Sequence, residues 1–129
     1  MIALADHRDA LMNLYRAFNQ RDIDSVLARL APGVDWPNGW EGGRIHGRDA
    51  VRDYWTRQWA EIDPRVEPMR IDAAPDGAVH VRVDQLVRDN AGKILSNNQV
   101  GHVYQFDGAF IKRMDIVDLP VEPDDEDNE

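Results

Sequence analysis

The segment Val34–Trp59, VDWPNGWEGGRIHGRDAVRDYWTRQW, decides how this chain folds. Its first part, Trp36-Pro37-Asn38-Gly39-Trp40, places two indoles around a turn, and the glycines that follow break the chain before a new periodic stretch begins. That stretch carries Trp55 and Trp59 four residues apart, which places them on one face of a helix. All four tryptophans of the protein lie in this segment. It therefore predicts the wall and mouth of a cavity for a small molecule.

The residues before this segment predict two helices. Apolar residues at spacings of three and four indicate the first helix over Leu4–Asn19. After the polar break Asn19-Gln20-Arg21, Asp22 can cap a second, shorter helix that Pro32-Gly33 ends. The apolar face of this second helix consists of Ile23, Val26, Leu27 and Leu30. Between it and the tryptophan turn, Val34–Trp36 can form only a short strand.

A third helix and a run of strands complete the chain. The helix should begin near Gly47 or Arg48 and end at Pro64. The strands expected after it are an irregular one over Val66–Ala73, an alternating one from Val79 to Asp84, a long one over Ile94–Phe106, and a last one over Phe110–Val117. Three helices followed by an antiparallel meander predict an α+β fold. We expect a cone of three N-terminal helices packed on a curved, mostly antiparallel sheet, with a hollow between them.

Length and charge indicate one domain with an acidic end. The 129 residues suffice for one core, and we expect a single domain over residues 1–119 followed by a disordered acidic tail over residues 120–129. The net charge is −9, but Glu122–Glu129 holds six acids and no base. The rest of the chain has 18 acids and 15 bases. The tail cannot bury enough apolar surface to order itself, so solvation is its expected role.

Several function classes are excluded by what the sequence lacks. There are no cysteines for disulfides, thiolate chemistry or cysteine-bound metals, and no apolar run approaches the roughly 20 residues of a membrane span. The N-terminus lacks the pattern of a signal peptide, so a cytoplasmic protein is expected. The sequence contains no basic stripe with interleaved aromatic residues, so nucleic acid is not expected as a partner. The glycines from Gly39 to Gly47 lack the lysine of a phosphate loop, and no ligand spacing predicts a metal, so no cofactor is expected.

Three stretches carry a resemblance to a known family. They are LYRAFNQRDIDSVLARLAPGVDW over Leu14–Trp36, GRDAVRDYW over Gly47–Trp55, and HVYQFDGAFIKRMDI over His102–Ile116. The first is similar to the helix, short polar break, second helix and first strand of the nuclear transport factor 2-like superfamily. The last resembles its aromatic strand, F-D-G turn and final strand. With these motifs the chain, over roughly residues 4 to 118, resembles the SnoaL-like and ketosteroid-isomerase-like branch. The superfamily includes isomerases, cyclases, dehydratases, epoxide hydrolases, transport factors and many proteins of unassigned function, so fold does not fix function.

The resemblance also assigns positions to the roles that ketosteroid isomerases need. A tyrosine on the first helix, an aspartate base after the first strand and an acidic donor on the penultimate strand correspond here to Leu14, Asn38 and His102. Leu14 cannot donate a hydrogen bond and Asn38 cannot take a proton at neutral pH. We therefore reject steroid isomerisation by that mechanism. The same correspondence implies that Trp36, Asn38, Trp40 and His102 point into the cone.

His102 and Asp115 are the candidate catalytic residues. His102 shares one strand face with Asn98, Val100, Tyr104 and Phe106, because strand side chains alternate. Its imidazole can exchange a proton near pH 7 or donate a hydrogen bond to a substrate oxygen; the alternative is a structural histidine bonded to a neighbour. Asp115 could orient or balance His102 if it points inward. If Met114 and Ile116 point inward instead, as the resemblance implies, Asp115 is a surface acid.

The candidate ligand-binding residues line the rest of the expected cavity: Trp36, Asn38, Trp40, Trp55, Trp59, Asn98 and Tyr104. Trp40, in a glycine-rich loop, has little core to join and is interpreted as a lid over a flat apolar ligand. The alternative for the helical tryptophans is core packing. Tyr15 and Tyr54 are interpreted as helix packing for the most part. The polar face of His80, Arg82 and Asp84 is expected on the outer side of the sheet, either solvated or in a dimer.

These residues support three hypotheses of function. In the first, the protein is a cofactor-free lyase, isomerase or cyclase that acts on a small apolar or aromatic substrate by proton transfer, with His102 as the acid, base or oxygen-polarising group. In the second, the cavity or the outer sheet face is a non-catalytic binding module. In the third, the sheet face forms only a homodimer and the cavity is vestigial. A homodimer through the sheet face is expected from the resemblance.

Overall fold

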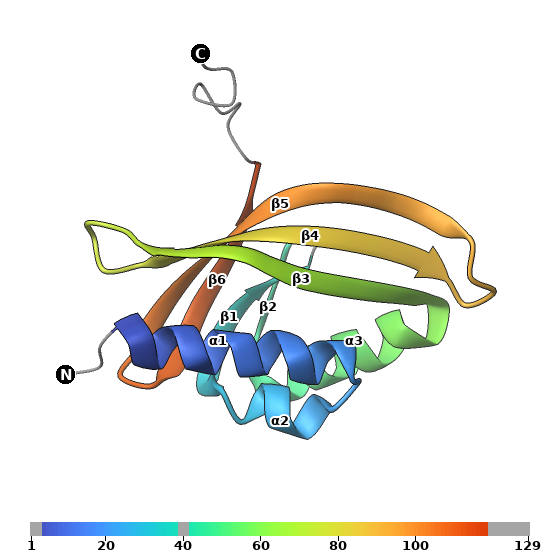
Figure 1. The fold of residues 1–129 in the computed structure, drawn as a ribbon. Coiled ribbons are helices and arrows are strands. Elements are labelled where there is room, and N and C mark those ends of the chain that lie inside the picture. The colour runs from blue at the N-terminus through green and yellow to red at the C-terminus, as the bar shows by residue number, and fades with distance from the viewer. Residues whose placement is uncertain (1–3, 39–41, 119–129) are drawn as a thin grey trace, which may run out of the picture.

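The computed structural model describes residues 4–38 and 42–118, which form three helices and one six-stranded sheet (Figure 1). The helices are α1 (Leu4–Asn19), α2 (Ile23–Leu27) and α3 (Arg48–Glu61). The strands are β1 (Leu30–Pro37), β2 (Arg44–His46), β3 (Ile62–Ala73), β4 (Val79–Asp89), β5 (Ile94–Asp107) and β6 (Phe110–Val117). The strand order across the sheet is β2-β1-β6-β5-β4-β3. Only β1 and β6 pair in parallel, so the sheet is mostly antiparallel.

The helices lie together on one side of the curved sheet, and this confirms the predicted α+β cone (Figure 1). The first helix and the last strand have the bounds that the sequence predicts, and α3 begins at Arg48 as expected. Gly47 precedes α3 with φ 90° and ψ 154°, a conformation that only glycine adopts readily. That turn lets the chain leave β2 and enter α3 without an intervening loop.

The second helix is shorter than its apolar pattern predicts. Asp22 does cap it, by accepting a 3.3 Å hydrogen bond from the backbone N–H of Ser25, but the helix ends at Leu27. Leu30, predicted on its apolar face, instead begins β1, where it pairs with Ile111 of β6. The guanidinium of Arg48 also donates to the Leu30 carbonyl at 2.6 and 2.8 Å. These contacts with distant residues hold the backbone extended, so β1 runs through the proline and glycine that were expected to separate helix from strand.

Two further differences concern strands. β2 was not predicted, because its three residues lie in what reads as a glycine-rich loop; it forms by antiparallel pairing of Ile45 with Trp36. β3 begins at Ile62, four residues before the predicted Val66, and Pro64 lies inside it. Pro64 is tolerated because β3 is an edge strand of the sheet, with a partner only on its β4 side. The irregularity expected at Pro68 is present as a register shift between Pro68 and Arg70.

The core lies between the helices and the concave face of the sheet. Valines at 79, 81 and 83 of β4 are buried there with Tyr104 of β5 and Leu11 of α1. β5 runs past the end of β6, since the last residue pair between them is Gly101 with Val117. The far halves of β3, β4 and β5 therefore extend beyond β6 in Figure 1. This end of the cone is where the helices and the sheet enclose less protein between them.

Candidate functional site

A cavity of about 540 Å³ lies between α1, α3 and the concave face of the sheet. Most of its wall is aromatic or aliphatic, and among the described residues the charged side chains on it are Arg44 and Asp115. Trp36 from β1 and Trp55 from α3 pack edge to face with ring centroids 5.4 Å apart. Trp36 also lies 6.3 Å from Tyr104 of β5. A cavity of this size with a largely aromatic wall suits a small, largely apolar molecule.

A chain of three buried polar groups crosses this wall. The Tyr104 hydroxyl donates to the Tyr15 hydroxyl at 2.8 Å, and the Tyr15 hydroxyl lies 2.8 Å from Nδ1 of His102. All three side chains are buried, and all three line the cavity. Both hydroxyl hydrogens are used when Tyr15 donates to Nδ1 of His102. That arrangement places the imidazole hydrogen on Nε2, for which no described residue provides an acceptor.

Burial determines the protonation states of these three side chains. It lowers the pKa of His102 to about 4, so the imidazole is neutral at pH 7. It raises the pKa of Tyr15 and of Tyr104 well above the usual value of a phenol, so both hydroxyls keep their hydrogens. At neutral pH the site therefore presents hydrogen-bond donors without a net charge. His102 is poorly suited to hold a proton, and well suited to donate a hydrogen bond to an oxygen.

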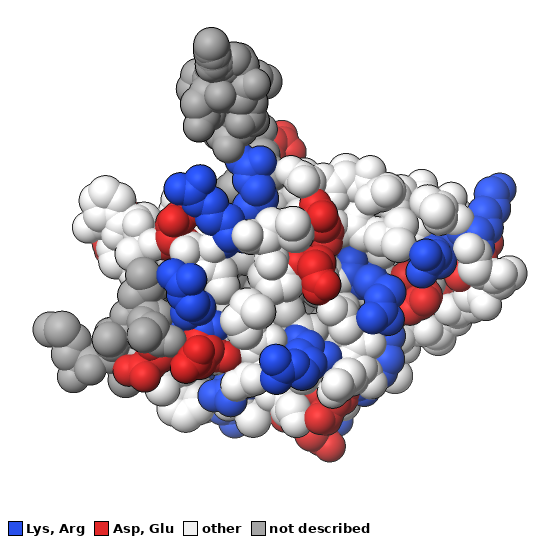
Figure 2. Space-filling model, viewed as in Figure 1, with Lys and Arg blue, Asp and Glu red and all other residues white. Residues whose placement is uncertain are grey.

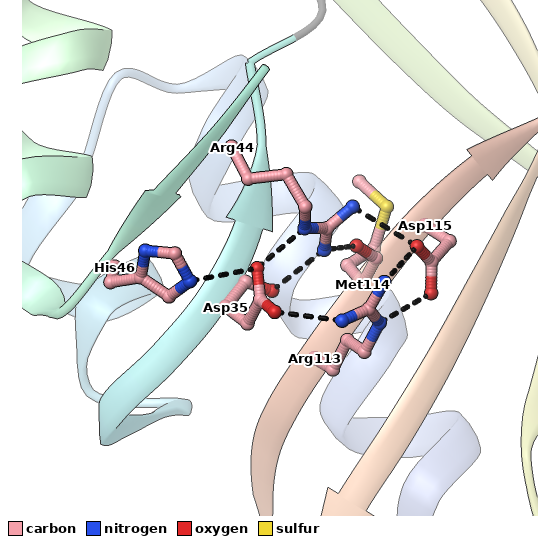
Figure 3. Close-up of polar contacts among 6 residues, drawn as sticks. All are labelled: Asp35, Arg44, His46, Arg113, Met114 and Asp115. Atoms are coloured by element: carbon pink, nitrogen blue, oxygen red, sulfur yellow. Dashed lines mark hydrogen bonds and ion pairs between the residues drawn. The ribbon is translucent and has the colours of Figure 1, made fainter.

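Asp115 belongs to a second polar cluster, in which Arg44 joins the adjacent strands β1 and β6 (Figure 3). From β2, Arg44 donates through Nε to the carboxylate of Asp35 at 2.5 Å and through Nη1 to Asp115 at 3.0 Å. Its Nη2 donates to the Met114 carbonyl at 2.6 Å. Arg113 donates to Asp115 at 2.9 and 3.0 Å and to Asp35 at 2.7 Å. The guanidinium of Arg44 thus links β1 and β6 beside the residue pair of Asp35 and Arg113.

The two arginines keep Asp115 ionised. Hydrogen bonds from Arg113, together with the charges of Arg113 and Arg44, lower the pKa of this carboxyl, although burial and the charge of Asp35 oppose them. The orientation left open by the sequence is settled by the register of β5 and β6. Ile116 pairs with His102 and Met114 with Tyr104, so these two share the concave face, while Asp115 pairs with Val103 on the other face. Asp115 reaches the cavity only at its edge, beside Arg44.

The structure brings together most, but not all, of the residues predicted for the site. Trp36, Trp55, His102, Tyr104 and Asp115 all line the cavity.

The remaining predicted residues lie elsewhere. Asn38 is buried in the turn after β1, where its backbone bonds to Gly42 and Gly43. Trp59 stacks on the far side of Trp55 with centroids 6.0 Å apart, and Asn98 is exposed past the end of β6. None of these three lines the cavity, and Trp40 falls outside the described residues.

Sequence reasoning missed Tyr15, Arg44 and Gln85 as parts of the cavity wall. Tyr15 lies on the buried stripe of α1 that was interpreted as packing, and the hydroxyl contact with His102 joins residues 87 positions apart. Gln85 did have a signal in the sequence. It continues the alternation of Val79, Val81 and Val83, so a polar side chain was due on the apolar face of that strand.

The described residues offer little for other kinds of site. Among residues 4–38 and 42–118, no three histidine, aspartate or glutamate side chains converge to hold a metal ion. None of the helices in this part of the chain is long and apolar enough to span a membrane. On the face drawn in Figure 2, basic side chains lie among acidic ones and form no basic surface.

The fold and this site can now be compared with known proteins. The sequence model of the SnoaL-like domain matches residues 11–114, from within α1 to within β6. The chain belongs to the SnoaL-like family. This confirms the resemblance to the nuclear transport factor 2-like superfamily that the motifs carried. No curated protein matches the sequence of this SnoaL-like protein.

Solved structures share its fold at low sequence identity. A nuclear transport factor 2-like protein of unknown function from Burkholderia pseudomallei is 24% identical, with a TM-score of 0.75 over 86% of this chain and 88% of that one. TerC, co-crystallised with polyporic acid, is 21% identical, with a TM-score of 0.75 over 87% and 90%. An epoxide hydrolase from Mycobacterium tuberculosis, described as LEH-like, is 21% identical, with a TM-score of 0.73 over 88% and 78%. At this identity the likeness shows the fold alone.

Proposed function

We propose that this SnoaL-like protein binds a small, largely apolar or aromatic molecule in its cavity and acts on it by proton transfer, as a cofactor-free isomerase, cyclase or lyase. The hydrogen-bonded chain of Tyr104, Tyr15 and His102 carries the proposal. It places on the cavity wall a donor, Nε2–H of His102, for which no described residue is an acceptor. Such a donor binds a carbonyl or hydroxyl oxygen, and in a water-poor cavity it stabilises negative charge that develops on that oxygen. Trp36 and Trp55 would hold the apolar part of the molecule.

The roles of the two candidate catalytic residues follow from their surroundings. His102 would polarise the substrate oxygen through Nε2–H, since a group with a pKa of about 4 is a weak base. Asp115 is ionised but engaged by two arginines, so we assign it to positioning the cavity edge. Asn38, Trp59 and Asn98 lie off the wall, and we do not assign them contacts with the ligand in this arrangement. No metal or cofactor enters the proposed reaction.

A second function is favoured by one observation. The only carboxylate on the cavity wall is tied into ion pairs, so the described residues offer no free base beside the His102 donor. That arrangement suits a non-catalytic binding module that holds its ligand by the same oxygen contact.

We also propose, from the superfamily resemblance, a homodimer through the outer sheet face, where His80 is exposed opposite the buried valines of β4. For a chain without cysteine, we propose a cytoplasmic setting.

Proton exchange separates the two functions without knowledge of the substrate. We would incubate the protein with 2-tetralone, an aromatic ketone, in D₂O and follow loss of the protons beside the carbonyl by NMR, with binding read from tryptophan fluorescence. The enzyme proposal expects faster exchange than in buffer, and loss of that gain in His102→Leu but not in the matched control His80→Leu. Binding without faster exchange would support the binding module. Absence of both would refute the proposal for aromatic ketones.

A further inference from the structure

One polar side chain interrupts an apolar row on the concave face of β4. Positions 79, 81, 83 and 87 of this row are valines, but position 85 is glutamine. Gln85 is half-buried and lines the cavity, and its amide makes no hydrogen bond within the described part of the chain. Placing an amide on an apolar wall costs free energy unless water or a ligand satisfies its hydrogen bonds. Packing alone therefore gives no reason for glutamine at this position.

Other polar groups line the cavity near this end, because α3 ends at Glu61 and the next residue, Ile62, pairs with Asp89 of β4. On α3, Nε2 of Gln58 donates to the Tyr54 hydroxyl at 3.1 Å, which leaves the Gln58 carbonyl oxygen as an acceptor. Ser96 of β5 pairs with Val87, the next inward residue of β4 after Gln85. Gln58, Tyr54 and Ser96 all line the cavity. Between this end and His102 lies Val100 of β5, an apolar lining residue that pairs with Val83 of β4.

The register of the sheet gives the distance between the two polar ends. His102 pairs with Val81, and Gln85 lies four residues further along β4. At about 3.3 Å per residue this places Gln85 roughly 13 Å from the level of His102. A molecule of two or three fused or linked rings spans such a distance. The cavity is thus polar at two separated places and apolar between them.

The charge of the lining restricts what the far end can bind. Within the part of the chain that the structure describes, Arg44 is the one lysine or arginine on the cavity wall, and its guanidinium already donates to Asp35, Asp115 and the Met114 carbonyl. A ligand carboxylate or phosphate would find no free cation there. Amides and hydroxyls instead bind neutral groups, because they supply both donors and acceptors.

We infer that Gln85 and Gln58 form a second polar subsite, and that the ligand is an elongated, neutral molecule with an apolar body and a hydrogen-bonding oxygen at each end. One oxygen accepts a hydrogen bond from Nε2–H of His102, and the other binds at Gln85 and Gln58. This inference rests on the proposed function, since it takes the same cavity to be the ligand site. It adds the ligand's length, its neutrality and a residue that selects for the second oxygen.

The test compares two probes that differ by one hydroxyl. By isothermal titration calorimetry we would measure the Kd of 4-phenylphenol and of 4,4′-dihydroxybiphenyl for the wild-type protein. A second hydrogen bond within the cavity should make the dihydroxy probe bind about three- to tenfold more tightly. In Gln85→Leu this ratio should fall to about one while 4-phenylphenol still binds. Gln99→Leu is the matched control, because Gln99 lies on the same sheet but faces outward opposite Asp84.

The ratio of the two affinities makes the result independent of any general loss of folded protein, and Gln58→Leu gives a second measurement from the opposite wall. Equal affinity of both probes for the wild type, or an unchanged ratio in both Gln85→Leu and Gln58→Leu, would overturn the second subsite and leave the proposed function in place. Failure of both probes to bind at all would contradict both the subsite and the proposed aromatic cavity.

Discussion

Tyr15→Phe is the substitution whose effect the structure defines most sharply. It removes one hydroxyl from the middle of the buried chain, so the Tyr104 hydroxyl loses its acceptor and Nδ1 of His102 loses its donor. Each buried polar group left without a partner costs about 1–3 kcal/mol. We therefore expect Tyr15→Phe to lower the free energy of unfolding by about 2–4 kcal/mol. In a domain of this size that corresponds to a fall in Tm of roughly 10 °C.

Tyr104→Phe is the matched control, because it removes a hydroxyl from the end of the same chain. Tyr15 can still bond to His102 in that variant, so we expect a loss of only about 1 kcal/mol. The double variant should be less destabilised than the sum of the single variants, because the second substitution removes a hydroxyl that the first one orphaned. Urea unfolding of all four proteins at pH 7 measures this cycle.

The result that would refute this reasoning is also defined. If Tyr15→Phe costs no more than Tyr104→Phe and the two effects add, the orphaned groups have found other partners. Water entering the cavity would then satisfy them, and the chain would not be the isolated polar element on which the proposed function depends.

Three further predictions concern stability. Burial lowers the pKa of His102 to about 4 in the folded protein, compared with about 6.5 in the unfolded chain. The stability that the neutral imidazole contributes is therefore complete above pH 6.5 and is lost by pH 4. Over that range, urea unfolding should show the wild type losing about 3 kcal/mol more than His102→Leu. Arg44→Lys should lower the free energy of unfolding by about 1–3 kcal/mol, since lysine cannot bridge Asp35, Asp115 and Met114 together. The control Arg52→Lys changes an exposed ion pair and should cost less than about 0.5 kcal/mol. Equal losses in the two variants would contradict the bridging role of Arg44. Gly47→Ala should cost about 1–3 kcal/mol by thermal unfolding because φ is 90° there, and a loss no greater than that of Gly33→Ala would show that the turn relaxes.

The periodicity of the sequence determined most of the secondary structure. The helical stripe of α1 and the alternation along β4 each reflect one face that must be buried, and burial of that face fixes the type of element locally. The full extent of β1 and the presence of β2 were not predicted in this way. Pro32, Gly33 and the glycines after Asn38 indicate turns, but β1 is held by parallel pairing with β6, some 80 residues away. The local preference of these residues for turns was outweighed by strand pairing with distant residues, which no local pattern encodes.

The same division holds for the site. The sequence by itself placed an imidazole among aromatic residues on one strand face and gathered the tryptophans into one segment, because both follow from alternation and spacing. It could not show that the Tyr15 hydroxyl meets His102, that Trp59 packs behind Trp55, or that Arg44 engages Asp115. These contacts depend on how α1, α3 and β2 are placed against the sheet. Only tertiary structure decided them, because a hydrogen bond requires two groups within about 3 Å, whereas spacing along one element gives direction alone.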